Sequence, residues 1–396
     1  MAGDSSALER VTIGSFRGIA EELHMLAFAS KAHLASRDVV RSLVKKALDA
    51  GPKDGISEQF ALSEWVNVVD AWQVFDLDSY AAIPRMGRKT RLGAKQRTVI
   101  WPIMQRVRDG LSELRLMTPA SLFAKLITHY KTKAHKPFTN LVIDEAQDLG
   151  VPELRFFSSI APPGQNALFF AGDLGQRIFQ LPFSWKELGV DVRGRAATLR
   201  VNYRTSHQIR TAADRLLPKT IRDVDGVEDG RAGTVSVFNG PPPLVLIADS
   251  EAEESAAVAT FVRKAIEEGI EASEIALFVR SRDQLPRARS AAKEAGVAIT
   301  ELTGRIEGEA GHIAIGTMHL AKGLEFKAVA VMACDESIIP AATRLGDVSD
   351  EMELDEVYAT ERHLLYVAAT RARDRLLVSA VRPESEFLID LKDTGV

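Results

Sequence analysis

The first part of the chain carries apolar residues at helical spacing. In residues 18–50 they recur every three or four positions, for example at Ile19, Leu23 and Leu26. This spacing places them on one face of an α-helix. Residues 58–75, 99–116 and 119–130 repeat the pattern. We therefore expect residues 21–118 to be mainly helical.

The pattern changes at Asn140, after which short apolar runs alternate with helical stretches such as residues 251–268 and 285–295. The apolar runs cover residues 141–143, 167–171, 244–248, 275–279, 329–333 and 376–380. Runs of this length between helices are typical of buried parallel strands in α/β units. The pattern thus predicts an α/β fold with parallel sheets.

Composition narrows the class of protein. The 396 residues allow two or three domains, and the longest apolar runs are too short to span a bilayer. The amino terminus lacks the charged-then-apolar order of a signal peptide. A single cysteine, Cys334, excludes an internal disulfide and a cysteine-rich metal site. We expect a cytoplasmic protein without membrane contact.

The charge is divided unevenly between the two parts of the chain. Residues 1–140 carry 21 Lys and Arg against 14 Asp and Glu, a net of +7, and residues 141–396 carry 29 against 40, a net of −11. The basic part is compatible with a nucleic-acid partner. The same charge distribution is equally compatible with solvated helix faces that happen to differ in sign.

Two apolar runs end in polar strings that suit phosphate chemistry. The run 141–143 leads into Asp144-Glu145-Ala146-Gln147-Asp148. At the carboxyl edge of a parallel sheet, one such carboxylate can hold Mg²⁺ and its neighbour can accept a proton from water. The run 167–171 leads into Gly172-Asp173-Leu174-Gly175-Gln176, where the glutamine can contact a terminal phosphate.

Three further strings combine cations, aromatics and turn residues. They are Asn202-Tyr203-Arg204, the segment Thr317-Met318-His319 that continues through Lys322-Gly323-Leu324-Glu325-Phe326, and Leu364-Leu365-Tyr366-Val367-Ala368-Ala369-Thr370-Arg371. In the last string, Leu364, Val367 and Ala368 predict a helical face turned to the core. Arg371 is then expected at the helix end, free to reach a neighbouring domain.

All five strings occur in this order in UvrD/PcrA-like superfamily 1 DNA helicases, which the chain resembles over about residues 12–380. Residues 12–20 also resemble the short DNA-contacting segment that this family carries near its amino terminus. The resemblance implies two RecA-like lobes of the P-loop NTPase fold. The first comprises residues 1–20 and 119–197 with a helical insertion at 21–118, and the second comprises residues 198–396.

The resemblance also implies an ATP site with Mg²⁺. Asp144 would help to hold Mg²⁺, Glu145 would activate water, and Gln176 would lie near the γ-phosphate. Arg204 and Arg371 would stabilise the charge that develops on the phosphate.

Further roles follow from the same resemblance. Tyr203 would stack on adenine and Glu325 would contact the ribose. The residues that match positions near single-stranded DNA are Ser15, Phe16, Phe179, Trp185, Thr317 and His319. Trp185 matches less well, because the tryptophan of the family follows the GDxxQ string more closely. For the aromatic residues after Gln176, a core position and base stacking are equally compatible with the sequence.

Two features depart from the family. The segment between Arg204 and Thr317 is short, so the large accessory domain inserted there is expected to be absent or vestigial. No G-x-x-x-x-G-K-[ST] string occurs, although that loop holds the phosphates of ATP. The first lobe is therefore expected to be incomplete.

Three explanations for the missing loop remain open. The chain is an amino-terminally truncated product, or a separate polypeptide supplies the loop, or the protein binds DNA without turnover. We favour truncation, because every other ATP-site string is present. The functional hypothesis is an ATP-dependent DNA helicase or translocase that moves 3′ to 5′ and serves DNA metabolism such as repair. The alternative is a non-catalytic DNA-binding or scaffolding subunit.

Overall fold

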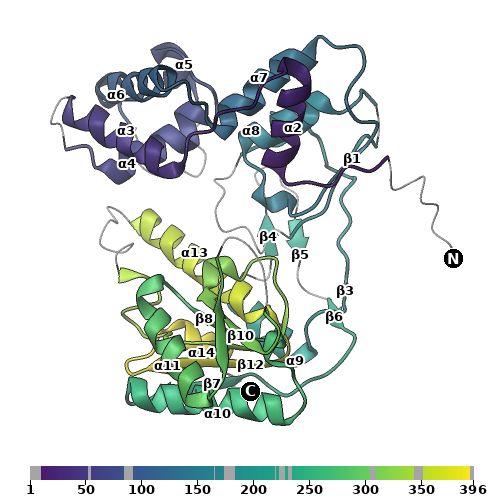
Figure 1. Ribbon diagram of the computed structural model, residues 1–396, viewed down its shortest axis with the longest axis vertical. Coiled ribbons are helices and arrows are strands. Elements are labelled where there is room, and N and C mark those ends of the chain that lie inside the picture. The colour runs from purple at the N-terminus through teal and green to yellow at the C-terminus, as the bar shows by residue number, and fades with distance from the viewer. Residues whose placement is uncertain are drawn as a thin grey trace. The chain divides into compact units, whose positions relative to one another are not determined.

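The computed structural model describes residues 10–51, 55–83, 92–164, 166–173, 183–218, 220–222, 228–230, 234–303, 309–342 and 351–392 (Figure 1). The chain divides into two compact units. One comprises Met1–Asp173 and Phe179–Gly194, and the other comprises Leu174–Ile178 and Arg195–Val396. Each unit has hydrophobic clusters of its own.

Helices form most of the first unit: α2 (Phe16–Phe28), α3 (Arg37–Asp49), α4 (Glu58–Glu64), α5 (Leu77–Ala82), α6 (Ala94–Glu113) and α7 (Pro119–Lys131), with the π-helical turn η1 (Trp65–Asp70) continuing α4. Hydroxyl groups of Ser36, Ser57 and Thr118 accept backbone N–H groups at three of the helix starts. The apolar faces of α3, η1 and α6 meet in a core around Trp65, Trp101 and Met104.

The first unit also holds a small parallel sheet. Strands β1 (Leu141–Ile143) and β2 (Leu168–Phe170) pair in register, with Val142 opposite Phe169. The turn η2 (Ala146–Asp148) and helix α8 (Val151–Ile160) lie between them in sequence. Side chains from α7 and α8, including Phe123 and Phe156, pack with Ile143 in one cluster. Val142 and Phe169, which share the other face, are 75% and 62% exposed.

A six-stranded sheet dominates the second unit, in the order β7-β12-β11-β8-β10-β9. The strands are β7 (Leu244–Ala248), β8 (Ile275–Val279), β9 (Ala298–Glu301), β10 (His312–Thr317), β11 (Phe326–Val331) and β12 (Ala372–Val381). Every neighbouring pair is parallel. All six carboxyl ends therefore lie along one edge.

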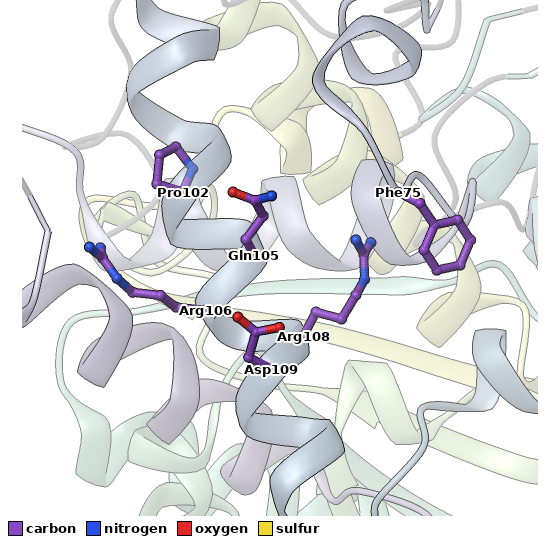
Figure 2. Close-up of a pocket in the computed structure, with 6 residues that line it drawn as sticks. All are labelled: Phe75, Pro102, Gln105, Arg106, Arg108 and Asp109. Atoms are coloured by element: carbon purple, nitrogen blue, oxygen red, sulfur yellow. The ribbon is translucent and has the colours of Figure 1, made fainter.

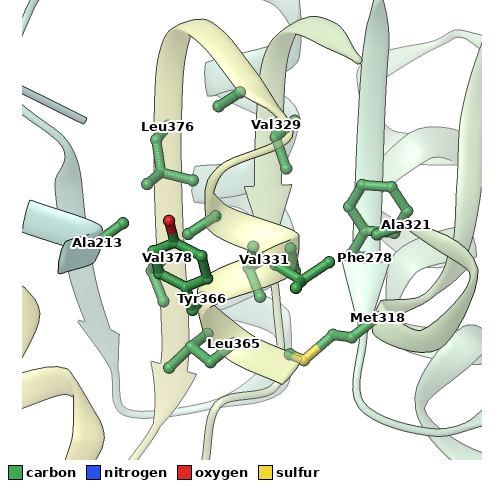
Figure 3. Close-up of a cluster of buried hydrophobic side chains, with 14 of the residues drawn as sticks. Ala213, Phe278, Met318, Ala321, Val329, Val331, Leu365, Tyr366, Leu376 and Val378 are labelled. Carbon is green, nitrogen blue, oxygen red and sulfur yellow. The ribbon is translucent and has the colours of Figure 1, made fainter. Parts of the chain in front are cut away.

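Helices cover both faces of this sheet (Figure 1). Helices α10 (Glu251–Glu267) and α11 (Leu285–Ala295) pack on the face that includes Leu277. Helices α9 (His207–Asp214), α13 (Glu351–Ala369) and α14 (Phe387–Leu391) pack on the face that includes Phe278. Figure 3 shows part of that second core, where Leu365 and Tyr366 of α13 lie over Val331 and Val378.

Shorter elements complete the second unit. Strand β3 (Val201–Asn202) pairs with β6 (Val235–Ser236), and β4 (Thr220–Arg222) pairs with β5 (Glu228–Gly230). Single turns of 3₁₀-helix lie at η4 (Ala272–Glu274), η5 (Arg282–Gln284) and η6 (Met318–Leu320).

The predicted α/β class is confirmed, and the six-stranded parallel sheet with helices on both faces has the form expected of a RecA-like lobe. The subdivision of the first unit into residues 21–118 and the remainder stays a prediction. None of the described helices has the length and apolar character needed to cross a membrane.

Candidate functional site

In the first unit, the structure joins two of the predicted strings at the carboxyl edge of β1 and β2. The Ala146 N–H donates to the Ala171 carbonyl at 2.8 Å, and the Ala171 N–H donates to the Ile143 carbonyl at 2.8 Å. Asp144 and Glu145 therefore lie beside Gly172 and Asp173. Glu145 has a left-handed backbone, with φ 52°, and its N–H donates to Asp144 Oδ1 at 2.8 Å.

Gln147, a buried residue, connects these strings through its amide group. Its Nε2 donates to Glu145 Oε2, and its Oε1 accepts the Asp173 N–H at 3.0 Å. Gly172 makes this approach possible, because a Cβ there would lie 2.5 Å from Gln147 Oε1. The amide thus holds the Glu145 carboxylate in a fixed orientation.

The same edge suits a hard cation that completes its coordination with other ligands. Asp144 is exposed and Glu145 is half-buried, so both carboxylates are accessible. Within the described residues, no group of three or more His, Cys, Asp or Glu side chains is placed to hold a metal. Such a pair fits Mg²⁺, which commonly binds one or two carboxylates together with water and substrate phosphates.

The aromatic residues predicted near DNA pack against other rings of the first unit. Phe16 lies edge-on to Phe157 with ring centroids 5.4 Å apart, and Trp185 lies edge-on to Phe170 at 4.9 Å. Ser15 caps α2 by accepting the Gly18 N–H at 3.1 Å. Two other predicted residues, Gln176 and Phe179, lie outside the described residues.

In the second unit, Arg204 and Glu325 meet although 121 positions separate them. Arg204 Nε donates to Glu325 Oε2 at 2.9 Å, and each side chain is 44% exposed. Glu325 directly precedes β11, so the pair lies at the amino edge of the six-stranded sheet. Tyr203, beside Arg204, is 73% exposed, which leaves its ring accessible for stacking.

Asn202 shapes the turn that presents Arg204. Its Oδ1 accepts the backbone N–H groups of Arg204 at 2.8 Å and Thr205 at 3.3 Å. Sequence reasoning missed this role of Asn202, although an Asn that precedes a polar turn is a known signal for such a bond. The role of Gln147 is also not apparent from the sequence. Its partner Asp173 is distant in sequence, and its partner Glu145 comes close only through a turn.

The expectation that Arg371 is free to reach a neighbouring domain is wrong for this structure. Its side chain is 1% exposed, Nε donates to the Val367 carbonyl at 3.1 Å, and Nη1 donates to the Leu324 carbonyl at 3.2 Å. The helix ends at Ala369 and β12 begins at Ala372. The guanidinium therefore turns inward, toward one carbonyl at the helix end and one in the segment before β11, instead of extending into solvent.

Thr317 and His319 lie at the opposite edge of the same sheet. Thr317 ends β10, and His319 follows in η6. Both side chains are half-buried, and Met318 between them is buried in the core. Two sets of predicted residues thus occupy opposite edges of the sheet, with Arg204, Glu325 and Arg371 at the amino edge.

A surface hollow elsewhere in the first unit includes none of the predicted residues. It has a volume of about 490 Å³ and is lined by Phe75, Pro102, Gln105, Arg106, Arg108 and Asp109 (Figure 2). Arg108 lies 4.5 Å from the centroid of the Phe75 ring and donates to the Val74 carbonyl. The contacts of this arginine are consistent with a structural role.

Comparison with known proteins identifies part of the second unit. Residues 295–383 match the model of the UvrD-like helicase C-terminal domain. ATP-dependent DNA helicase UvrD1 of Mycobacterium leprae is 38% identical over 96 residues, which is 22% of this chain and 11% of that protein. ATP-dependent DNA helicase srs2 of Schizosaccharomyces pombe is 39% identical over 88 residues, 22% of this chain and 9% of that protein.

A further relative and a solved structure show similarly partial matches. ATP-dependent DNA helicase PcrA of Bacillus subtilis is 34% identical over 92 residues, 20% of this chain and 12% of that protein. The C-terminal domain of a possible DNA helicase from Lactobacillus plantarum is 21% identical with a TM-score of 0.32, covering 48% of this chain and 95% of that one. The three helicases of Mycobacterium leprae, Schizosaccharomyces pombe and Bacillus subtilis are thus each matched over about a tenth of their own length.

Proposed function

We propose that this chain, of which residues 295–383 match the UvrD-like helicase C-terminal domain, is part of an ATP-driven motor that moves 3′ to 5′ on single-stranded DNA. The observation that carries the proposal is the Arg204–Glu325 pair. Two of the predicted nucleotide-contacting strings meet there at 2.9 Å, at one edge of a parallel sheet. The predicted DNA-contacting residues Thr317 and His319 lie at the other edge.

Each unit carries candidate nucleotide-contacting groups of its own. In the first unit, Asp144 would hold Mg²⁺, and Glu145, oriented by Gln147, would accept a proton from the attacking water. In the second unit, Tyr203 offers an exposed ring for adenine and Glu325 an acceptor for the ribose. Bound MgATP would supply the phosphoryl group whose transfer drives movement.

The two predicted arginines of the second unit differ in how accessible they are to a phosphate. Arg204 is exposed enough to contact a phosphate after its carboxylate partner turns to the ribose. Arg371 is buried, so a role in stabilising the transferred phosphoryl group requires the helix end to rearrange. We therefore assign the larger contribution to Arg204.

The exposed face of the β1–β2 sheet supports a further part of the proposal. Val142 and Phe169 present apolar side chains to solvent at 75% and 62% exposure. Isolated two-stranded sheets are marginally stable, and apolar faces are normally covered. We propose that another segment, from the same gene product or from a separate polypeptide, packs here and supplies the P-loop.

The test is ATP turnover in the presence and absence of oligo(dT). It has two arms, the chain alone and the chain fused at Met1 to the P-loop segment of Bacillus subtilis PcrA. We expect DNA-stimulated hydrolysis in the fused arm, with Glu145→Gln reducing turnover by about a hundredfold or more. Turnover by the chain alone would also support a motor, and would show that no added loop is needed.

The result against a motor is oligo(dT) binding without turnover in both arms. The alternative, a non-catalytic DNA-binding or scaffolding subunit, would then be favoured. Direction is tested separately by displacement of streptavidin from oligonucleotides biotinylated at either end. Displacement from the 5′ end alone is expected for movement 3′ to 5′.

A further inference from the structure

A buried ion pair lies at the carboxyl edge of the six-stranded sheet, and neither of its members is among the predicted site residues. Arg280 donates through Nε to Glu361 Oε2 and through Nη2 to Glu361 Oε1, each at 2.6 Å. The two side chains are 9% and 0% exposed. A buried pair of this kind often stabilises a protein no more than apolar residues of the same volume would. Its two-point geometry instead fixes where the two elements lie relative to each other.

The pair is adjacent to the predicted DNA contacts. Arg280 follows Val279, and Val279 is the register partner of Thr317 on the neighbouring strand. Glu361 belongs to α13, which packs against η6, the turn that carries His319. Figure 3 shows Met318, at the start of that turn, in the same core as Leu365 of α13.

The two residues that follow α13 contact the chain neighbours of Arg204 and Glu325. The Thr370 carbonyl accepts the hydroxyl of Thr205, next to Arg204, at 3.5 Å. Arg371 Nη1 donates to the carbonyl of Leu324, next to Glu325, at 3.2 Å. From Glu361 to Ala369 the helix extends about 12 Å, enough to connect one edge of the sheet to the other.

We propose that the Arg280–Glu361 pair is a positioning element that couples DNA binding beside Thr317 to the alignment of Arg204 and Glu325, with α13 as the rigid connection. The inference rests on the proposed function, because it takes Thr317 and His319 as DNA contacts. A ligand that displaces η6 or the end of β8 changes the position of Glu361. The helix then carries that shift to the Thr370 and Arg371 contacts.

The test is amide hydrogen exchange with and without oligo(dT), followed in peptides that cover residues 320–326 and 364–373. In the wild-type chain we expect bound oligo(dT) to slow exchange there by about fivefold. The informative variant combines Arg280→Met with Glu361→Leu, which removes both charges together and so leaves neither one buried alone. It should bind oligo(dT) within about threefold of wild type, yet lose the exchange response.

Val262→Ala is the matched control. Val262 is fully buried on α10, against the other face of the sheet, so this change loosens the second unit without touching α13. It should keep the response. If the double variant does not melt cooperatively, Arg280→Lys replaces it, because a lysine keeps the charge but loses the two-point geometry.

Three outcomes would contradict the inference. They are an unchanged response in the pair variant, equal losses in that variant and in Val262→Ala, and the lack of any response in a wild-type chain that binds oligo(dT). Failure of the wild-type chain to bind oligo(dT) would instead refute the proposed function, and the inference with it. The binding measurement separates these cases.

Discussion

The two parallel sheets of this protein differ in how much of their surface is covered. In the second unit all five residues of β8 are buried, and helices pack on both faces. In the first unit β1 and β2 have a core on one face, while Val142 and Phe169 of the other face are mainly exposed. The well-covered sheet therefore forms a stable frame for Arg204 and Glu325. The Asp144 and Glu145 side chains depend on a sheet that is half covered.

The largest difference between the two sheets should appear in the stability lost when an aromatic side chain is removed from each. Phe278→Ala removes a fully buried ring from β8 and should lower the free energy of unfolding of the second unit by about 3 to 5 kcal/mol. Phe169→Ala on the exposed face of β2 should change stability by less than about 0.5 kcal/mol. Urea unfolding of both variants measures this. A loss above about 2 kcal/mol for Phe169→Ala would mean that its face is already covered.

A buried carboxyl in the first unit should make its stability depend on pH. Burial raises the pKa of Asp70 to about 6, against opposing hydrogen bonds from Thr118 and Gln73. The raised pKa favours the protonated group in the folded state. Its stabilising contribution is thus fully present below the unfolded pKa of 3.8 and is lost as pH rises through about 6.

Asp70→Asn should remove this dependence. Relative to wild type, the variant should gain about 2 kcal/mol of stability between pH 4 and pH 7, because the amide carries no charge to bury. Thermal or urea unfolding at both pH values checks the result. Asp109→Asn, an exposed carboxylate on α6, is the control and should show no such gain. A constant difference between Asp70→Asn and wild type would contradict the raised pKa.

A smaller effect is expected where the two strings of the first unit meet. Gly172→Ala places a Cβ 2.5 Å from Gln147 Oε1 and 3.2 Å from two backbone nitrogens. Relief of these contacts should cost about 1 to 2 kcal/mol and should turn the amide away from Glu145. Unfolding measures the cost, and turnover in the fused arm should fall with it. Ala167→Gly is the control. Gly189→Ala is unsuitable, because the positive φ of Gly189 would strain an alanine there.

The sequence predicts those helices and strands whose own residues show a clear pattern of apolar positions. The apolar runs at 244–248 and 275–279 are strands β7 and β8 with the expected bounds, and residues 119–130 lie in α7. Strand β9 is not predicted, because Ala298–Glu301 mixes apolar and polar residues. The stripe of Leu364, Val367 and Ala368 is fully buried, as expected of a helix turned to the core.

Side-chain partners were harder to predict. The strings placed Arg204 and Glu325 near one site, but nothing in their spacing showed that they pair directly. The position of Arg371 at a helix end was predicted, whereas its burial depends on the Leu324 carbonyl, 47 positions away. The Arg280–Glu361 pair gave no signal, because its charges look like surface residues until the sheet and α13 bring them together.

The most direct measurement of the central claim is fluorescence anisotropy of labelled oligo(dT) titrated with wild type, His319→Ala and Arg204→Ala. The claim is that DNA contacts and nucleotide contacts occupy opposite edges of one sheet. We expect the wild-type chain to bind, His319→Ala to weaken binding by about tenfold, and Arg204→Ala to leave binding unchanged. Absence of binding by the wild-type chain, or equal losses in the two variants, would contradict the account.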